Sequence, residues 1–199
     1  ANDGKTNDPI FTSCLKYASK VILIEPNASL KNQLASSYHS FVGELDILTV
    51  AIHPSDTSAD LFTVGYHASN SEPLKNSHAN LTAISSFDKV HVIRMLKKYA
   101  GKYSDYFIST ISVDCLPLSS IITDKLADYS ILLQVDCEGF DAQVITSLGD
   151  CLPDIINYER KHLPSPDREM LDTWLTNNCY VQYPHGGDSL AIHVKTTFS

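Results

Sequence analysis

Short apolar runs of strand length alternate with segments of helical period along most of the chain. Residues 21–24, 46–52, 131–136 and 155–159 form the clearest runs, and each is predicted to be a buried strand. Residues 180–183 and 189–194 flank a turn around Gly186 and Gly187, which predicts a hairpin near the end of the chain. Strands that alternate with helices are typical of a parallel α/β sheet, here closed by that hairpin.

Helices are expected between these strands, each with one apolar face. Asp8 can cap the first helix, with Pro9 at its first position, and Asn27 can cap the second. A third is expected over about 117–127, and a fourth carries Val144, Ile145 and Leu148. The last helix would run from Ser165 to about 177 and bury Met170, Leu171, Trp174 and Leu175.

The pattern loosens between about 54 and 112, where Ser, Asn and His residues cluster. We interpret this stretch as an insertion in a single domain that spans residues 1–199. Within it, residues 60–64 alternate like a strand, and residues 85–88 fit a variant capping box. The helix that this box opens would carry Phe87, Val90, Ile93, Met95 and Leu96 on its apolar side, and it could lie over the active site.

Composition excludes two classes of partner. The formal charge of −8 argues against a protein that binds a nucleic-acid backbone, because such binding depends on clustered Lys and Arg. No apolar run approaches the roughly 20 residues that a membrane-spanning helix needs, so a soluble domain without a membrane partner is expected. The 5 cysteines show no C-x-x-C pair, and their odd number favours free thiols and a cytoplasmic location. Oligomeric state has no signal in this pattern.

Candidate chemistry begins at the amino terminus. Residues 1–9 place a loop with Gly4 directly before a predicted helix, where backbone N–H groups attract anionic ligands. Glu25 follows at the carboxyl end of the next predicted strand, where a carboxylate can accept both hydroxyls of a ribose. A plain capping loop and a solvated carboxylate are the ordinary alternatives, and the pairing of the two features favours nucleotide binding.

Four motifs carry a resemblance to a known family. Residues 1–4 (Ala-Asn-Asp-Gly) look like the tail of a glycine-rich loop, and residues 25–27 look like an E-P-N turn. Residues 136–141 are similar to a D-x-E-G-[FY]-[DE] stretch, and residues 111–116 resemble a T-x-D-x-L segment, with Ser112 in place of Thr. In this order and spacing they resemble the FkbM family of class I, S-adenosylmethionine-dependent methyltransferases.

The resemblance implies a Rossmann-like, three-layer α/β sandwich. Its mostly parallel sheet should have seven strands in the order 3-2-1-4-5-7-6, with strand 7 antiparallel. The first strand should end at the glycine-rich loop, so we expect it to precede Ala1 and to be missing from this chain.

The resemblance also implies transfer of a methyl group from S-adenosylmethionine to a hydroxyl of a small molecule or glycan. The residues it places at the cofactor are Asn2, Asp3, Gly4, Glu25, Asn27, Ala51 and Asp136. Asp136 and Glu159 end consecutive predicted strands, so their carboxylates should converge and could hold Mg²⁺. Without a metal, Asp136 could meet the cofactor's amino group, and Glu159 or His162 could act as the general base.

Two other functions fit parts of the pattern. A catalytically silent domain could keep the cofactor pocket and serve in assembly, but it would not need carboxylates at both Asp136 and Glu159. A dehydrogenase would use a full G-x-G-x-x-G loop, of which residues 1–9 hold no complete copy. Glu138 is as well explained by the start of a helix as by catalysis. Basic residues of the insertion could form a solvated face or recognise an anionic substrate: Arg94, Lys97, Lys98 and Lys102.

Overall fold

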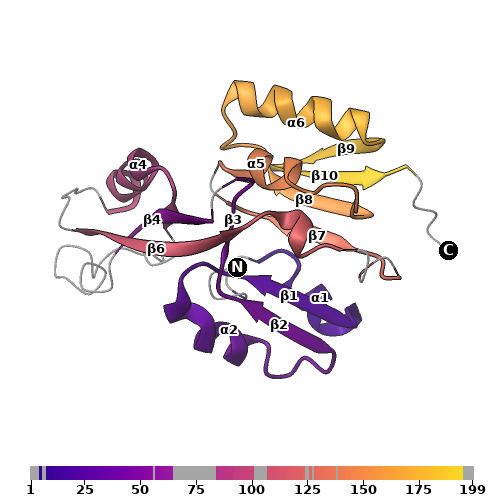
Figure 1. The fold of residues 1–199 in the computed structure, drawn as a ribbon, viewed down its shortest axis with the longest axis horizontal. Coiled ribbons are helices and arrows are strands. Elements are labelled where there is room, and N and C mark those ends of the chain that lie inside the picture. The colour runs from indigo at the N-terminus through magenta and orange to yellow at the C-terminus, as the bar shows by residue number, and fades with distance from the viewer. Residues whose placement is uncertain are drawn as a thin grey trace.

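The computed structural model describes residues 5, 8–55, 57–64, 84–100, 107–123, 126, 128–137 and 139–194. Their strands form three sheets (Figure 1). The first pairs β1 (Lys20–Ile24) with β2 (Glu44–Leu48), and the second has the order β7 (Leu132–Val135), β8 (Ile155–Glu159), β10 (Asp188–His193), β9 (Tyr180–His185). The third has the order β3 (Ala51–Ile52), β6 (Ile108–Leu116), β4 (Ser58–Val64), β5 (Ser85–Ser86).

A single seven-stranded parallel sheet is therefore not what the structure contains, although two parts of its expected order are present. β1 is parallel to β2, and β7 is parallel to β8, while β10 lies antiparallel between β8 and β9. These arrangements match the segments 3-2 and 4-5-7-6 of the expected order. Among the described residues β1 pairs only with β2 and β7 only with β8, so no described strand joins the two sheets.

The apolar run at 46–52 is two strands rather than one. β2 ends at Leu48 beside β1, whereas β3 pairs Ala51 with Cys115 and Ile52 with Leu116 of β6. The chain thus changes its hydrogen-bonding partner within one continuous hydrophobic stretch. Hydrophobicity reports burial and not the partner strand, so the pattern could not reveal this break.

The insertion forms an arm in which β4 and β6 pair along seven positions, from Ser58 with Asp114 to Val64 with Ile108, with α4 (Lys89–Ala100) beside β4 (Figure 1). Residues 85–86 lie in β5, and Asp88 caps α4 because its Oδ1 accepts the N–H of Val90 at 2.8 Å. The helix buries Val92, Met95 and Leu96. Val90 was predicted inside, but it is 69% exposed and His91 is buried instead.

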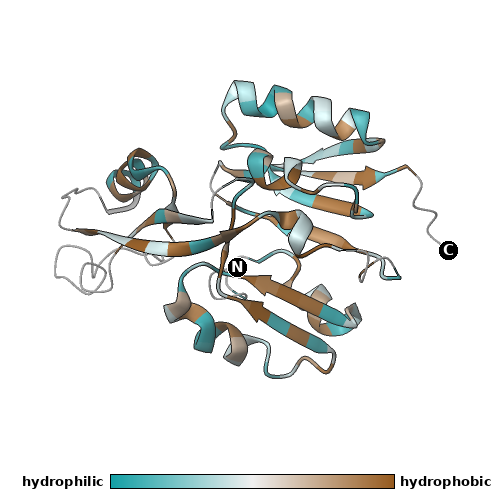
Figure 2. Ribbon diagram, viewed as in Figure 1, coloured by the Kyte–Doolittle hydropathy of each residue, from teal (hydrophilic) through white to brown (hydrophobic). Residues whose placement is uncertain are grey.

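The main core lies between the β7-β8-β10-β9 sheet and two helices, α5 (Asp141–Thr146) and α6 (Ser165–Asn177). Figure 2 shows hydrophobic residues gathered on the strands. Leu171 and Leu175 of α6 are fully buried as predicted, but Met170 is 42% exposed. The helix predicted over 117–127 is not α-helical in its described part, which contains the 3₁₀ turn Leu118–Ser120 and a further 3₁₀ residue at 126.

A separate core lies between the β1-β2 sheet and two short helices, α1 (Phe11–Tyr17) and α2 (Lys31–Ser37). Asp8 does not cap α1: its Oδ1 accepts the N–H of Ile10 at 2.9 Å, which forms a turn before the helix begins at Phe11. Asn27 caps a 3₁₀ turn, Ala28–Leu30, that leads into α2.

None of the five cysteines, which all lie in the described ranges, forms a disulfide, as predicted. None of the helices in the described ranges is long and apolar enough to cross a membrane.

Candidate functional site

A glutamate and a histidine meet at the carboxyl end of β8. Glu159 is the last residue of the strand, and its Oε2 lies 2.8 Å from Nδ1 of His162 in the following turn. The two side chains are only 19% and 22% exposed, respectively. When a carboxylate accepts a hydrogen bond from Nδ1, the lone pair of Nε2 can take a proton from another molecule. The pair therefore has the parts of a general base and the group that orients it.

Asp141, which the sequence analysis did not single out, holds the ends of two strands together. Its side chain is completely buried at the start of α5, and its carboxylate accepts the N–H of Cys137 at 3.3 Å and that of Glu159 at 3.2 Å. Cys137 follows Asp136 beyond β7. The β7 register pairs Val135 with Tyr158, so the next residues, Asp136 and Glu159, lie at the same level on neighbouring strands.

The two expected catalytic residues, Asp136 and Glu159, thus lie next to a third acid, Asp141. Burial, and after it the negative charge of Asp136, raises the pKa of Asp141 to about 7, although the N–H groups of Glu159 and Cys137 oppose the shift. Asp136 itself is exposed. The sequence did contain a sign of this role, because Asp141 is the final acid of the D-x-E-G-F-D stretch. An acid at that place can accept hydrogen bonds from the backbone at the strand ends.

Glu25 occupies the corresponding end of β1. It is only 8% exposed, its Oε1 accepts the N–H of Asn27 at 2.9 Å, and its own N–H donates to Leu48 of β2. Asn27 Oδ1 in turn accepts hydrogen bonds from the N–H and hydroxyl of Ser29. Carboxylate and amide oxygens are thus fixed at one strand end, where a ribose could be held.

The remaining expected residues are placed differently. Ala51 is buried in β3, so it belongs to another sheet than either Glu25 or Glu159. Other expected site residues lie outside the described residues: Asn2, Asp3, Gly4, Glu138 and Lys102. Within the described ranges, no group of three or more His, Cys, Asp or Glu residues is placed to hold a metal ion.

Aromatic ring contacts connect the insertion to this end of the sheet. His91 of α4 faces His162 with ring centroids 6.4 Å apart, and Nδ1 of His91 lies 2.9 Å from Nη2 of Arg94. Phe87, before α4, packs edge-on against Phe140, before α5, at 5.4 Å. These contacts place α4 beside His162, a candidate general base, while its position over an active site stays a prediction.

His53 completes a group of three partly buried rings. It stacks on Phe140 at 5.5 Å and meets Phe87 edge-on at 5.8 Å. Its position, directly after the buried residues of β3, was the only signal in the sequence.

A family model of the methyltransferase FkbM domain matches residues 1–182, which is most of the chain. The chain belongs to the FkbM methyltransferase family. No curated protein and no solved structure matches it significantly. The match to the FkbM domain contains Glu25, Asp136, Asp141, Glu159 and His162, and it ends within β9.

Proposed function

We propose that this FkbM methyltransferase transfers a methyl group from S-adenosylmethionine to a hydroxyl of a small molecule or glycan, with His162 as the general base. The observation that carries the proposal is the 2.8 Å contact between Glu159 Oε2 and His162 Nδ1 at a strand end. Proton removal by a positioned histidine typically contributes about 10²–10⁴-fold to a rate. A hydroxyl acceptor, which must lose its proton, suits such a base.

S-adenosylmethionine would supply a methyl group on a positively charged sulfur. Glu25 and Asn27 fit this cofactor, because a nearly buried carboxylate at the carboxyl end of a strand is the usual partner of ribose hydroxyls. Asp136, one strand from Glu159, would accept from the cofactor's amino group. The sulfonium would supply the methyl carbon and keep the carbon–sulfur electron pair, and Nε2 of His162 would take the proton that the acceptor hydroxyl loses.

A metal-dependent mechanism, with Mg²⁺ held by Asp136 and Glu159, is the alternative. It is supported by the positions of these two residues at the ends of neighbouring strands. The metal-free version is favoured by the engagement of Glu159, whose Oε2 is next to His162 and whose N–H is bonded to Asp141. Glu159 then orients the base and is not required as a ligand.

Calorimetric titration with S-adenosylhomocysteine, the demethylated product, tests the cofactor assignment. Glu25→Ala should weaken binding, with an upper guide of about 1.5–3 kcal/mol for each charge-assisted hydrogen bond lost. Glu44→Ala is the matched control, because Glu44 lies on the neighbouring strand β2 and pairs with Lys20. Unchanged affinity in Glu25→Ala would remove this residue from the cofactor site.

A turnover assay distinguishes a methyltransferase from the two alternative functions, a silent assembly domain and a dehydrogenase. Release of S-adenosylhomocysteine should be measured with a panel of monosaccharides, oligosaccharides and small alcohols. Binding of the cofactor without turnover on any acceptor would favour a silent assembly domain. A nicotinamide dinucleotide retained by the purified protein would favour a dehydrogenase instead.

A further inference from the structure

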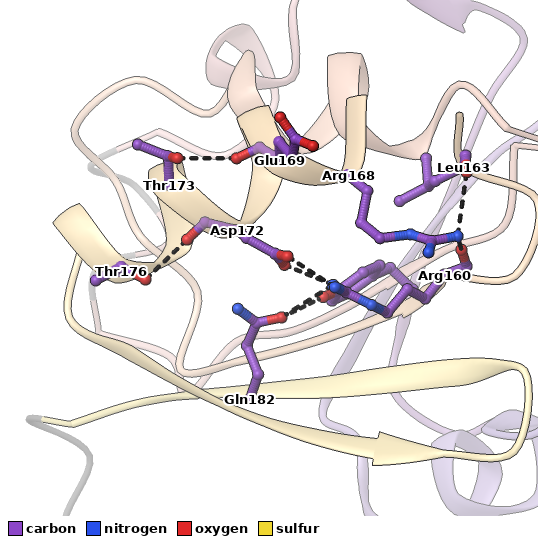
Figure 3. Close-up of polar contacts among 9 residues, drawn as sticks. Arg160, Leu163, Arg168, Glu169, Asp172, Thr173, Thr176 and Gln182 are labelled. Atoms are coloured by element: carbon purple, nitrogen blue, oxygen red, sulfur yellow. Dashed lines mark hydrogen bonds and ion pairs between the residues drawn. The ribbon is translucent and has the colours of Figure 1, made fainter. Parts of the chain in front are cut away.

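The turn that carries His162, residues 160–163, is held by side chains of α6. Arg160 reaches α6 through a bidentate ion pair, with Nη1 2.5 Å and Nη2 2.7 Å from the two carboxylate oxygens of Asp172 (Figure 3). Gln182 of β9 adds a weaker contact to Arg160 Nη1 at 3.4 Å. Arg160 directly follows Glu159, so the ion pair fixes the chain just beyond the carboxylate that meets His162.

Arg168 of α6 also contacts this turn. Its Nη2 donates to the carbonyl oxygens of Arg160 at 3.4 Å and Leu163 at 3.3 Å, and these residues flank the one that bears the imidazole (Figure 3). The N–H groups of Arg160 and Lys161 donate to the carbonyl of Gly187 in the hairpin turn. The turn is therefore tied to α6 by two guanidinium groups and to the hairpin by its backbone.

The ion pair stays charged over a wide pH range. The hydrogen bonds from Arg160 lower the pKa of Asp172 below its ordinary value, and the same contact raises the pKa of Arg160. A bidentate guanidinium–carboxylate pair fixes direction as well as distance. It thus limits rotation of the segment between Glu159 and His162.

Arg168 is not arranged for stability alone. Its Nε is buried and has no hydrogen-bond partner among the described residues. A buried N–H without a partner is unfavourable, so a native structure that keeps one is expected to gain something else from the side chain. Here the gain is the pair of hydrogen bonds to the carbonyl oxygens of Arg160 and Leu163 beside His162.

We propose that Asp172 and Arg168 are positioning residues, which hold the 160–163 turn so that Nδ1 of His162 stays bonded to Glu159. The effect of these residues on turnover rests on the proposed function, because it assumes that His162 is the base. Their effect on the tautomer of His162 does not depend on that assumption. With Nδ1–H fixed on Glu159, the ring adopts the Nδ1–H tautomer and presents Nε2 as an acceptor.

The tautomer can be measured without an acceptor molecule. Nitrogen chemical shifts of ¹⁵N-labelled histidine distinguish the Nδ1–H form from the Nε2–H form, which imidazole prefers in water. The signals of His162 are assigned by their disappearance in His162→Gln. In the parent protein, at a pH where the ring is neutral, the Nδ1–H form should dominate.

Asp172→Asn and Arg168→Met remove two different contacts of the turn, so the proposal can be tested even if one of the variants does not fold. Each should shift His162 towards the Nε2–H form, as should the positive control Glu159→Ala. Glu169→Gln is the matched negative control, because it removes one negative charge from an exposed position of α6. Arg168→Met removes both hydrogen bonds from Nη2 to the turn together with the unpartnered Nε.

The results separate this proposal from the proposed function. If both variants keep the parent tautomer while Glu159→Ala loses it, Asp172 and Arg168 do not position His162. If the tautomer responds but His162→Gln turns over like the parent, the positioning stands and the base assignment fails. If both hold, kcat should fall by roughly 10-fold or more in each variant, which is part of the about 10²–10⁴-fold that a general base contributes, while the affinity for S-adenosylhomocysteine stays unchanged.

Discussion

Replacing Asp141 with Asn should raise the stability of the protein at alkaline pH. The side chain is completely buried, and its pKa is raised from 3.8 to about 7, chiefly by burial. Each unit of pKa shift corresponds to about 1.4 kcal/mol, so the charged form costs about 4 kcal/mol relative to an unshifted carboxyl. Asn has nearly the same shape and carries no charge, so it removes this cost.

The sign of the effect follows from proton binding. Between pH 3.8 and about 7 the folded protein keeps a proton on Asp141 that the unfolded chain has lost. The contribution of Asp141 to the free energy of unfolding therefore falls as pH rises through this window, and above it the full cost is present. Asn can accept only one of the two N–H groups, which costs about 1 kcal/mol at any pH. The variant should be slightly less stable than the parent near pH 4 and up to about 3 kcal/mol more stable near pH 8.

Urea unfolding of both proteins across pH 4–8 measures this difference, because groups that titrate alike in both proteins cancel. Asp154→Asn is the control for loss of one carboxylate, since Asp154 accepts the N–H of Ile131 before β7. A constant difference between Asp141→Asn and the parent would show that Asp141 does not titrate in this range. A variant less stable at every pH would show that the charge of Asp141 is net stabilising.

Three further results are expected. Leu171→Ala should cost about 2–5 kcal/mol in urea unfolding, because Leu171 is fully buried, whereas Met170→Ala on the exposed side of α6 should cost much less; equal losses would contradict the packing of α6. Turnover should survive a chelator, and loss of activity that Mg²⁺ restores would instead support the metal version at Asp136 and Glu159. A structure of a longer chain should contain a parallel strand between β1 and β7, and direct pairing of these two strands would refute the expected sheet order.

Much of the strand order could be predicted from sequence. The strands β7 and β8, each an apolar run, and the hairpin around Gly186 and Gly187 followed from local pattern and turn residues, whereas the order of the strands was implied by the resemblance to the FkbM family. Periodicity gave α6 its length but not its rotation, so Met170 was placed inside although it is exposed. Val90 was misplaced for a similar reason, because α4 begins only after the cap at Asp88.

Tertiary contacts account for what the sequence could not predict about the site. The contact between Glu159 and His162 is local, but it depends on the turn after β8, which tertiary contacts with α6 and the hairpin hold. Asp141 could be recognised as the end of a motif, but its bonds to two strand ends depend on the pairing of those strands. The approach of His91 to His162 joins segments far apart in the chain, for which a single sequence holds no signal.

The central claim is that His162, oriented by Glu159, removes the acceptor's proton during methyl transfer. It is tested most directly by comparing His162→Gln with the parent at saturating S-adenosylmethionine, on whichever acceptor the panel identifies. In this variant kcat should fall by about 10²-fold or more, while the affinity for S-adenosylhomocysteine should stay the same. A variant that turns over at the parent rate would contradict it.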